Sequence, residues 1–389
     1  MKNEAFPLGG NIKGARMTDQ ELLYTMALTM ALRYHSKHQR TLLDTLGSAT
    51  AVYENRSDIG RFFEDLSPRL GEAIATMAGL LPQCEKELAY ARAHQIRMIA
   101  IGDADYPRRL RQCEDAPILI YTLGNADFNA AHVVSIVGTR RCTERGRDLA
   151  QQLVAGIAAQ CPGTLIVSGL AYGVDVAAHR ASLEAGLPTV GILAHGLDEI
   201  YPRSHRQTAI EMLKLGGLLT EFTSHTPIDR LNFLQRNRIV AGLADAVVIV
   251  ESPARGGSLN TARLANDYQR DVFAFPGRPS DVNSEGCNLL IRRNGAVLIT
   301  SADDLLSDLG WQTTAAAADK GQTMLFPDLT AEEQAIVDAL RAAEADLAQA
   351  DLAVALDMPV YKLTPLILAL EMKGVVKVLP GNKYHLVGL

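Results

Sequence analysis

Short apolar runs alternate with longer amphipathic stretches over residues 133–309. The apolar runs cover residues 133–137, 165–167, 189–193, 246–250, 272–275 and 297–299. Four β-branched aliphatic residues and one serine make up the first run, which is typical of a strand buried inside a parallel sheet. The stretch 143–160 that follows has leucine or isoleucine at every fourth position, as in a helix with one buried face. This alternation predicts an α/β fold with a doubly wound, Rossmann-like parallel sheet, whose core spans residues 131–310.

Helical patterns without strands fill residues 17–95, ahead of the predicted sheet. Apolar residues at helical spacing indicate one helix over 20–34, and a second helix ends at Gly47. We therefore predict an all-helical N-terminal domain of the SAM or helix-hairpin-helix type. Its first helix is expected to be capped by Thr18 or Asp19.

Two segments flank this helical domain. Residues 1–16 are Gly-rich without periodicity, and we expect a disordered extension there. Residues 96–130 contain two short strand patterns, at 97–100 and 117–121, which we interpret as a connector that docks on the sheet. The second predicted domain therefore spans residues 96–310.

The C-terminal part of the chain is predicted to be a separate small domain. Residues 311–327 show no strand pattern, which is typical of a linker. Residues 328–389 then contain three helical patterns, the first capped by Thr330, followed by a hairpin pattern at 375–386. Three helices and a hairpin describe a winged helix.

Composition adds a few constraints. The 389 residues are 48% apolar and 21% charged, and no apolar run approaches the ~18 residues of a membrane-spanning helix. The five cysteines are an odd number without a CxxC pair, which argues against disulfides and a structural zinc site. We expect a cytoplasmic protein with no membrane partner, metal or cofactor. The net charge of −6 argues against a broadly basic nucleic-acid binder but leaves room for a local basic groove.

Glycine turns follow three of the predicted strands. They contain Gly138, Thr139 and Arg140, then Ser168 and Gly169, and later Gly257 and Ser258. A helix is predicted after each turn, and the free N–H groups and dipole of a helix N-terminus attract anions such as phosphate. Arg140 adds a forked hydrogen-bond donor suited to phosphate. These residues alone fit an anion site and an ordinary strand-to-helix loop equally well.

Three side chains beside these turns have structural interpretations. Ser258 is predicted to cap the helix that follows the last turn. Asp175 is predicted to cap the helix that carries His179, and we expect this histidine to be packed rather than catalytic.

The stretch 230–238 is the most informative part of the chain. It contains Arg230, Arg236 and Arg238, two asparagines including Asn237, and the aromatic residue Phe233. Single-stranded nucleic acid is bound by this mixture, because cations contact its backbone and a ring stacks on a base. The alternative is a helix whose arginines pair with Asp175, Glu221 or Glu251. Arg236, Asn237 and Arg238 are consecutive and cannot all point one way on a helix, so at least one of them is expected to be structural.

Several catalytic signatures are missing from the sequence. No GxGxxG follows a strand, and no P-loop, HExxH or GxSxG pattern is present. The residues therefore predict a binding protein rather than an enzyme.

The chain resembles the DNA-processing protein A family (DprA, also called Smf). The resemblance is carried by IVGTRRCTERG (136–146), IVSGLAYGVDVAAH (166–179), GLDEIYP (196–202), FLQRNRIVAGLADAVVIVE (233–251), GGSLNTA (256–262), VFAFPG (272–277) and EGCNLLI (285–291). These stretches cover nearly the whole predicted α/β domain in the family's order.

The resemblance implies a function and partners. Members of the family bind single-stranded DNA on the α/β domain, dimerise through it, and load the recombinase RecA onto DNA during natural transformation. The family's Gly-x-Arg loop maps onto Gly138, Thr139 and Arg140, and its cation and base-contacting aromatic map onto Arg230 and Phe233. An alternative function is that of a nucleotide-binding enzyme of a related fold that cleaves N-glycosidic bonds.

The residues and the resemblance together predict one nucleic-acid site without catalytic residues. The predicted site comprises Gly138, Thr139, Arg140, Ser168, Gly169, Arg230, Phe233, Arg236, Asn237, Gly257 and Ser258.

The predicted winged helix is not expected to contribute to this site. Residues 328–389 carry nine acidic and five basic side chains. The helix at 360–373 has no Arg, Asn or Gln to contact base edges. We expect this unit to bind protein and to be dispensable for binding single-stranded DNA.

Overall fold

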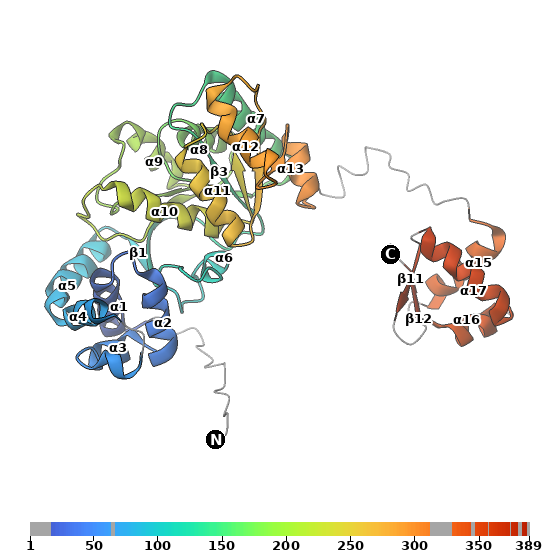
Figure 1. Ribbon diagram of the computed structural model, residues 1–389, viewed down its shortest axis with the longest axis horizontal. Helices are drawn as coiled ribbons and strands as arrows, with labels where there is room; N and C mark the ends of the chain where they lie inside the picture. Colours follow the sequence, from blue (N-terminus) through green and yellow to red (C-terminus); the bar gives the residue numbers. More distant parts are fainter. Residues whose placement is uncertain are drawn as a thin grey trace. The chain divides into compact units, whose positions relative to one another are not determined.

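A nine-stranded sheet, in the order β1-β2-β6-β5-β4-β3-β7-β8-β9, organises most of the chain (Figure 1). The strands are β1 (Arg97–Ala100), β2 (Leu119–Gly124), β3 (Val133–Val137), β4 (Leu165–Ser168), β5 (Thr189–Ile192), β6 (Gly217–Thr220), β7 (Ala246–Ile249), β8 (Asp271–Ala274) and β9 (Val297–Leu298). Strands β3 to β9 pair in parallel, whereas β1 and β2 join the sheet in antiparallel orientation beside β6.

The computed structural model describes residues 17–63, 67–311, 329–343, 347–356, 358–373, 375–379 and 383–386. The chain divides into two compact units, Met1–Gln312 and Thr313–Leu389. The predicted extension at 1–16, nearly all of the predicted linker and the hairpin turn at 380–382 lie outside the described residues. No helix in the described part of the chain is long and apolar enough to cross a membrane.

The parallel part of the sheet is doubly wound, which confirms the predicted fold class. The chain starts at the central strand β3 and adds β4, β5 and β6 on one side. It then returns to the other side of β3 and adds β7, β8 and β9. The strand order reverses between β3 and β7, and open α/β sheets bind ligands at the carboxyl ends of strands at such a reversal.

Helices cover both faces of this sheet. They are α6 (Arg108–Arg111), α7 (Glu144–Gln160), α8 (Val174–Glu184), α9 (Arg206–Met212), α10 (Arg230–Leu243), α11 (Gly257–Asp267), α12 (Glu285–Arg292) and α13 (Ala302–Asp308), with 3-10 turns at Arg203–His205 and Val282–Ser284. The side chains of β3 alternate between two cores, because successive strand residues point to opposite faces. Val133 packs in the core that contains residues of α10 and α11, and Val134 in the core that contains residues of α7, α8 and α13.

Two features of the sheet differ from the sequence prediction. Strand β6 was not predicted, because its four residues give too short an apolar run between glycines and a threonine. The segment predicted as a separate connector supplies β1 and β2, which extend the sheet through the antiparallel pairing of β2 with β6. Neither correction moves the strands that border the reversal point.

The N-terminal helices pack against this antiparallel edge, and Figure 1 shows them in blue beside β1. They are α1 (Asp19–Ala31), α2 (Ser36–Leu46), α3 (Ala49–Glu54), α4 (Pro68–Ala75) and α5 (Met77–Ala93), with a 3-10 turn at Ile59–Arg61. The Thr18 side chain caps α1, and Gly47 ends α2 in the left-handed conformation, as predicted. Met26 and Leu28 of α1 share one core with Leu119 of β2. The domain boundary at residue 95 stays a prediction.

The second unit is a winged helix, as the sequence indicates. It contains α15 (Ala331–Ala343), β10 (Leu347–Ala348), α16 (Gln349–Ala355), α17 (Val360–Met372), β11 (Val376–Leu379) and β12 (Lys383–Leu386). The strands form a small sheet in the order β10-β12-β11. The Thr330 hydroxyl accepts a hydrogen bond from the Glu333 N–H, and the Glu333 carboxylate accepts one from the Thr330 N–H. This reciprocal cap starts α15 at the predicted position.

Candidate functional site

A pocket of about 500 Å³ lies at the reversal point of the sheet. Four segments line it: the loop after β3, the loop after β4, the first turns of α10 and the first turn of α11. Ten of the eleven predicted site residues line this pocket: Gly138, Thr139, Arg140, Gly169, Arg230, Phe233, Arg236, Asn237, Gly257 and Ser258. The structure therefore brings together residues from four distant parts of the sequence, while their role stays a prediction.

The loop that carries Arg140 is held by its neighbours. The Thr139 N–H donates a hydrogen bond of 2.7 Å to the Glu251 carbonyl oxygen. Gly173, in the loop after β4, has a φ of 81°, and a Cβ there would run into the Thr139 carbonyl group and lie 2.8 Å from the Arg140 carbonyl oxygen. Glycine is therefore needed for this close approach of the two loops. The backbone is fixed, while the Arg140 side chain is exposed to solvent.

The N-terminus of α7 does not form the anion site that the sequence analysis considered. The Thr143 hydroxyl accepts a hydrogen bond from the Gly146 N–H and caps the helix. The buried Glu251 carboxylate accepts hydrogen bonds from both the backbone N–H and the hydroxyl of Thr143. Because a carboxylate already occupies this helix end, it is not available to a phosphate.

The N-terminus of α11 is the open one. Its N-cap residue is Gly256, which offers no side-chain cap. The prediction that Ser258 caps this helix is wrong, because the Ser258 hydroxyl donates 2.9 Å to Ser252 Oγ instead. Apart from its own helix backbone and chain neighbours, no atom lies within 4 Å of the position that a Cβ on Gly257 would take, so the first turn of α11 faces free space at the pocket.

Helix α10 presents the aromatic ring of the pocket. Its N-cap is Asp229, whose side chain accepts a hydrogen bond from the Leu231 N–H. Phe233 is half-buried, and the guanidinium carbon of Arg140 lies 5.0 Å from the centre of its ring. The ring of Tyr201 meets Phe233 edge-on at 6.0 Å. Arg230 lies one turn earlier on the helix and is exposed, so a second cation lies close to the ring along the helix.

Arg236 lines the pocket but is almost fully buried. Only 4% of this residue is exposed, and its Nη1 donates 2.5 Å to the Ile192 carbonyl oxygen. A Cβ on Gly169 would run into the Arg236 guanidinium, so the glycine turn after β4 makes room for it. Burial lowers the pKa of Arg236 to about 10, while the nearby Asp175 carboxylate opposes this shift. Burial also raises the pKa of Asp175, and Arg236 partly offsets that rise.

Three further residues singled out in the sequence are not part of the pocket lining. Ser168, the one predicted site residue outside the pocket lining, is fully buried and donates 2.6 Å to the Ile136 carbonyl oxygen. Arg238 forms a buried ion pair with Glu221, which confirms that an arginine of the 230–238 stretch is structural. His179 is fully buried, as expected, with Nδ1 2.7 Å from Thr189 Oγ1 and a pKa that burial lowers to about 3.

Two further predictions about side-chain partners are corrected here. Asp175 is not the N-cap of α8, because that position belongs to Gly173 and Asp175 lies in the first helical turn. Glu251, considered as a partner for an arginine, binds Thr143 instead. Asp175 thus lies at the pocket lining, and Glu251 lies at the N-terminus of α7.

The apolar rim of the pocket was not predicted from the sequence. Ile228 and Leu234 line it and are 41% and 45% exposed. Leu234 lies one helical turn after Arg230, so the spacing on α10 could have indicated it. No comparable signal precedes Ile228, which lies in the loop before the helix.

The groups that line the pocket suit a ligand that carries phosphate and a flat ring. The pocket's exposed cations and the open helix end attract phosphate, and its ring and apolar rim offer a surface for a base. The acidic side chains that line it are Asp175, which is buried against Arg236, and Asp229, which caps α10. In the described ranges, no three His, Cys, Asp or Glu side chains gather into a group that could hold a metal ion.

Comparison with known proteins places these features in a family. The family model for "DNA recombination-mediator protein A" matches residues 97–310, and that for the "DprA winged helix domain" matches residues 322–382. DNA processing protein DprA from Streptococcus pneumoniae is 37% identical over 209 residues, which cover 54% of this chain and 73% of the relative. Protein Smf from Synechocystis is 40% identical over 216 residues, covering 54% of this chain and 52% of that protein, or about half its length.

Solved structures of DprA proteins are also similar to this chain. The X-ray structure of DprA from Streptococcus pneumoniae superposes with a TM-score of 0.62 at 30% identity, covering 73% of this chain and 97% of that chain. DNA processing protein A from Helicobacter pylori, studied for its single-stranded DNA binding mode, superposes with a TM-score of 0.50 at 29% identity. That match covers 55% of this chain and 95% of that chain.

Proposed function

Because this chain belongs to the family of DNA recombination-mediator protein A, we propose that it binds single-stranded DNA in the pocket beside β3 and β7. The observation that carries the proposal is the placement of Arg140 over the half-buried ring of Phe233, at the mouth of that pocket. One base stacks on or beside the ring, while phosphates on either side contact Arg140 and Arg230. A relative of known structure is described by its single-stranded DNA binding mode, which supports the same ligand here.

The open end of α11 gives the strand a further contact. Uncapped N–H groups at this helix end donate hydrogen bonds to one phosphate without reading a base, because backbone donors carry no sequence information. Binding is therefore expected to depend weakly on sequence and strongly on salt.

The test compares single-stranded and double-stranded oligonucleotides by fluorescence anisotropy over a series of salt concentrations. We expect tighter binding of the single strand, and an affinity that falls as salt rises. Equal affinity for both forms would contradict the proposal, because a duplex does not offer an unstacked base to Phe233.

The family description supports a finer proposal about the reaction that uses this complex. A recombination mediator delivers single-stranded DNA to a recombinase, and we propose that this chain loads RecA during natural transformation, in the cytoplasm. The test is the rate at which RecA assembles on a single strand already coated by single-strand-binding protein. We expect this chain to accelerate the assembly of RecA. An unchanged rate of assembly would contradict the proposed loading of RecA.

The free edge of the sheet supports a homodimer. Strand β9 ends the sheet, and its residues Val297 and Leu298 are 51% and 47% exposed. Exposed apolar residues on an edge strand favour pairing with a second copy. Analytical ultracentrifugation of the wild-type protein and of Leu298→Lys tests this, with a dimer expected only for the wild type.

The alternative function, hydrolysis of N-glycosidic bonds, has little support in the pocket. Such chemistry needs a carboxylate that can reach the substrate, whereas Asp175 is buried and Asp229 is engaged as a helix cap. We propose that the protein is not an enzyme. Release of free base from nucleoside monophosphates would contradict this.

A further inference from the structure

Hydrogen bonds join the N-terminal helices to residues 221–238 of the α/β domain at three places. The Glu87 carboxylate on α5 accepts hydrogen bonds from the backbone N–H and the hydroxyl of Ser224. Tyr34 and Arg33 contact Asn232, and the Ser36 hydroxyl accepts a hydrogen bond of 3.0 Å from Arg238. This segment ends in the helix that carries Arg230 and Phe233. The N-terminal helices therefore touch the segment that supplies the ring of the proposed DNA site.

Asn232 is the central contact of the three. It is fully buried, and its side-chain oxygen accepts hydrogen bonds of 2.7 Å from the Tyr34 hydroxyl and 3.3 Å from Arg33 Nη2. Its side-chain nitrogen donates 3.0 Å to the Pro227 carbonyl oxygen. One buried amide thus joins the N-terminal helices, the loop before α10 and the first turn of α10. A buried side-chain amide whose oxygen and nitrogen both have hydrogen-bond partners holds the neighbouring elements in one arrangement.

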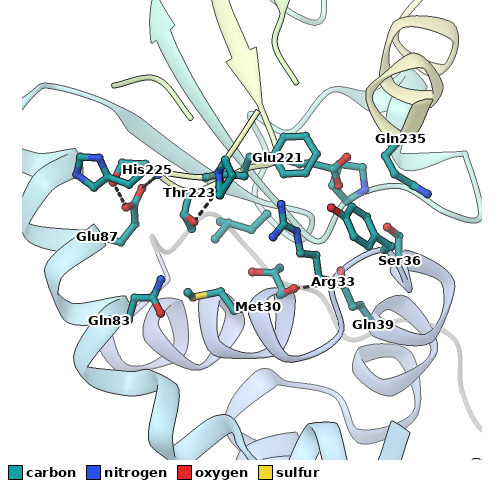
Figure 2. A pocket seen from close by; sticks show the side chains of 18 of the residues that line it. Met30, Arg33, Ser36, Gln39, Gln83, Glu87, Glu221, Thr223, His225 and Gln235 are labelled. Carbon is teal, nitrogen blue, oxygen red and sulfur yellow. Dashed lines mark hydrogen bonds between the residues drawn. The ribbon is translucent and has the colours of Figure 1, made fainter. Parts of the chain in front are cut away.

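Much of the space between the two parts is not filled by side chains. A pocket of about 520 Å³ separates the N-terminal helices from residues 221–227. Figure 2 shows Arg33 pointing into this pocket from the N-terminal helices, with Gln235 of α10 across from it. Because the pocket replaces close packing here, the orientation of the first turn of α10 depends on the hydrogen bonds to Asn232.

The backbone of Tyr34 is strained where it makes this contact. Its φ is 68°, in the left-handed region that residues with a side chain rarely adopt. An aromatic residue keeps this backbone conformation only where contacts with the surrounding structure stabilise it. Backbone strain of this kind is concentrated at functional sites. Here the strained conformation directs the hydroxyl to Asn232.

The position of Asn232 couples it to the DNA site. Asn232 and Phe233 are neighbours on α10, so their side chains project about 100° apart around the helix axis. Asn232 faces the N-terminal helices, and Phe233 faces Arg140. A rotation of the first helical turn that broke the Asn232 contacts would also move the Phe233 ring away from Arg140.

We propose that Tyr34, Arg33 and Asn232 are positioning residues for the DNA site, through which the N-terminal helices hold the Phe233 ring in its binding orientation. The proposal rests on the proposed function. None of the three lines the DNA pocket, so their effect on DNA is indirect.

Tyr34→Phe is the variant that tests this, because it removes one hydroxyl and keeps the ring. Tyr24→Phe is the matched control, since Tyr24 lies on α1 and its hydroxyl accepts a hydrogen bond from Gln20 rather than contacting α10. We expect Tyr34→Phe to weaken single-stranded DNA binding about three- to tenfold, as the loss of one buried hydrogen bond would. Tyr24→Phe is expected to bind like the wild type. Asn232→Ala, which removes all three hydrogen bonds, is expected to show a larger loss.

Two further measurements separate positioning from general stability. Hydrogen exchange of the backbone amides of residues 228–236 in the free protein is expected to be faster in Tyr34→Phe and unchanged in Tyr24→Phe. Combining Tyr34→Phe with Phe233→Ala is expected to add little to the loss of affinity from Phe233→Ala alone, because the hydroxyl acts through the ring.

The outcomes are distinct for the two proposals. If the wild type does not bind single-stranded DNA, the proposed function fails, and unchanged exchange at residues 228–236 would overturn the positioning role as well. If the wild type binds and Tyr34→Phe binds equally well, or if the two substitutions are additive, only the positioning inference is overturned.

Discussion

Arg140 and Phe233 meet at the mouth of the pocket, with 5.0 Å between the guanidinium carbon and the ring centre. The loop after β3 supplies the cation, and the first turns of α10 supply the ring. An arginine above a ring stabilises the ring's orientation and leaves its N–H donors free for phosphate. The predictions below test this arrangement and the buried groups that support it.

Arg140→Ala is expected to weaken single-stranded DNA binding by about 1.5–3 kcal/mol, since it removes one charge-assisted contact. The side chain is exposed, so the melting temperature should stay near that of the wild type. Arg263→Ala is the matched control, because Arg263 is an exposed arginine on α11 that pairs with Asp267 and does not line the pocket. An Arg140→Ala protein that is folded and binds as tightly as the control would remove Arg140 from the site.

Phe233→Ala should lower the affinity by roughly 1–3 kcal/mol if a base stacks on the ring. Phe233→Leu keeps an apolar side chain of similar reach but offers no flat face. We expect both variants to lose affinity and Phe233→Leu to keep its melting temperature. If Phe233→Leu binds like the wild type, the ring contributes through packing and not through stacking.

Acid is expected to destabilise the protein through His179. Burial lowers the pKa of this histidine to about 3, well below its ordinary value, so protonation favours the unfolded chain. Stability is therefore lost as the pH falls from about 6.5 toward 3, by a few kcal/mol in total. Urea unfolding across this range should show a shallower loss for His179→Gln. A pH dependence identical to that of the wild type would contradict this assignment.

Removing Arg236 is expected to cost stability rather than only affinity. Arg236→Met leaves the buried Asp175 carboxylate without its cation, at a cost of about 3–5 kcal/mol. Because burial raises the pKa of Asp175 and Arg236 opposes that rise, the variant should lose more stability as the pH increases above about 4. The double variant Arg236→Met, Asp175→Asn should recover part of the loss, which denaturant unfolding at two pH values measures.

Truncation after Gly310 is expected to leave the affinity for single-stranded DNA unchanged. The winged helix forms its own compact unit, and Leu363, Ile367 and Leu370 of α17 pack into its core. Lys373 is bound to Glu333 within the same unit. Anisotropy on the truncated protein tests this. A large loss of affinity in a truncated protein with unchanged oligomeric state would show that the winged helix takes part in binding.

The sequence by itself determined the fold class and most of the elements that border the pocket. The apolar runs at 133–137 and 246–250 predict β3 and β7, because strands covered on both faces must be apolar throughout. The glycine turn at residues 138–140 and the mixture of arginine, asparagine and phenylalanine on α10 could likewise be found in the sequence. These signals are local, so the sequence contains them in full.

Only the tertiary structure decided which of these side chains reach the pocket. Arg230, Arg236 and Arg238 share one stretch, yet the first is exposed, the second is a buried part of the pocket lining and the third pairs with Glu221. Helix geometry spreads neighbouring side chains around the axis, and the elements packed on each side then decide which are buried.

The tertiary structure also decided whether the helix N-terminus after β3 is open. The N-terminus of α7 is closed by Glu251, which follows β7 and reaches Thr143. The two residues meet because β3 and β7 are neighbours in the sheet. The local sequence does not determine that neighbour relation, since strand order follows from how the whole chain buries its apolar faces.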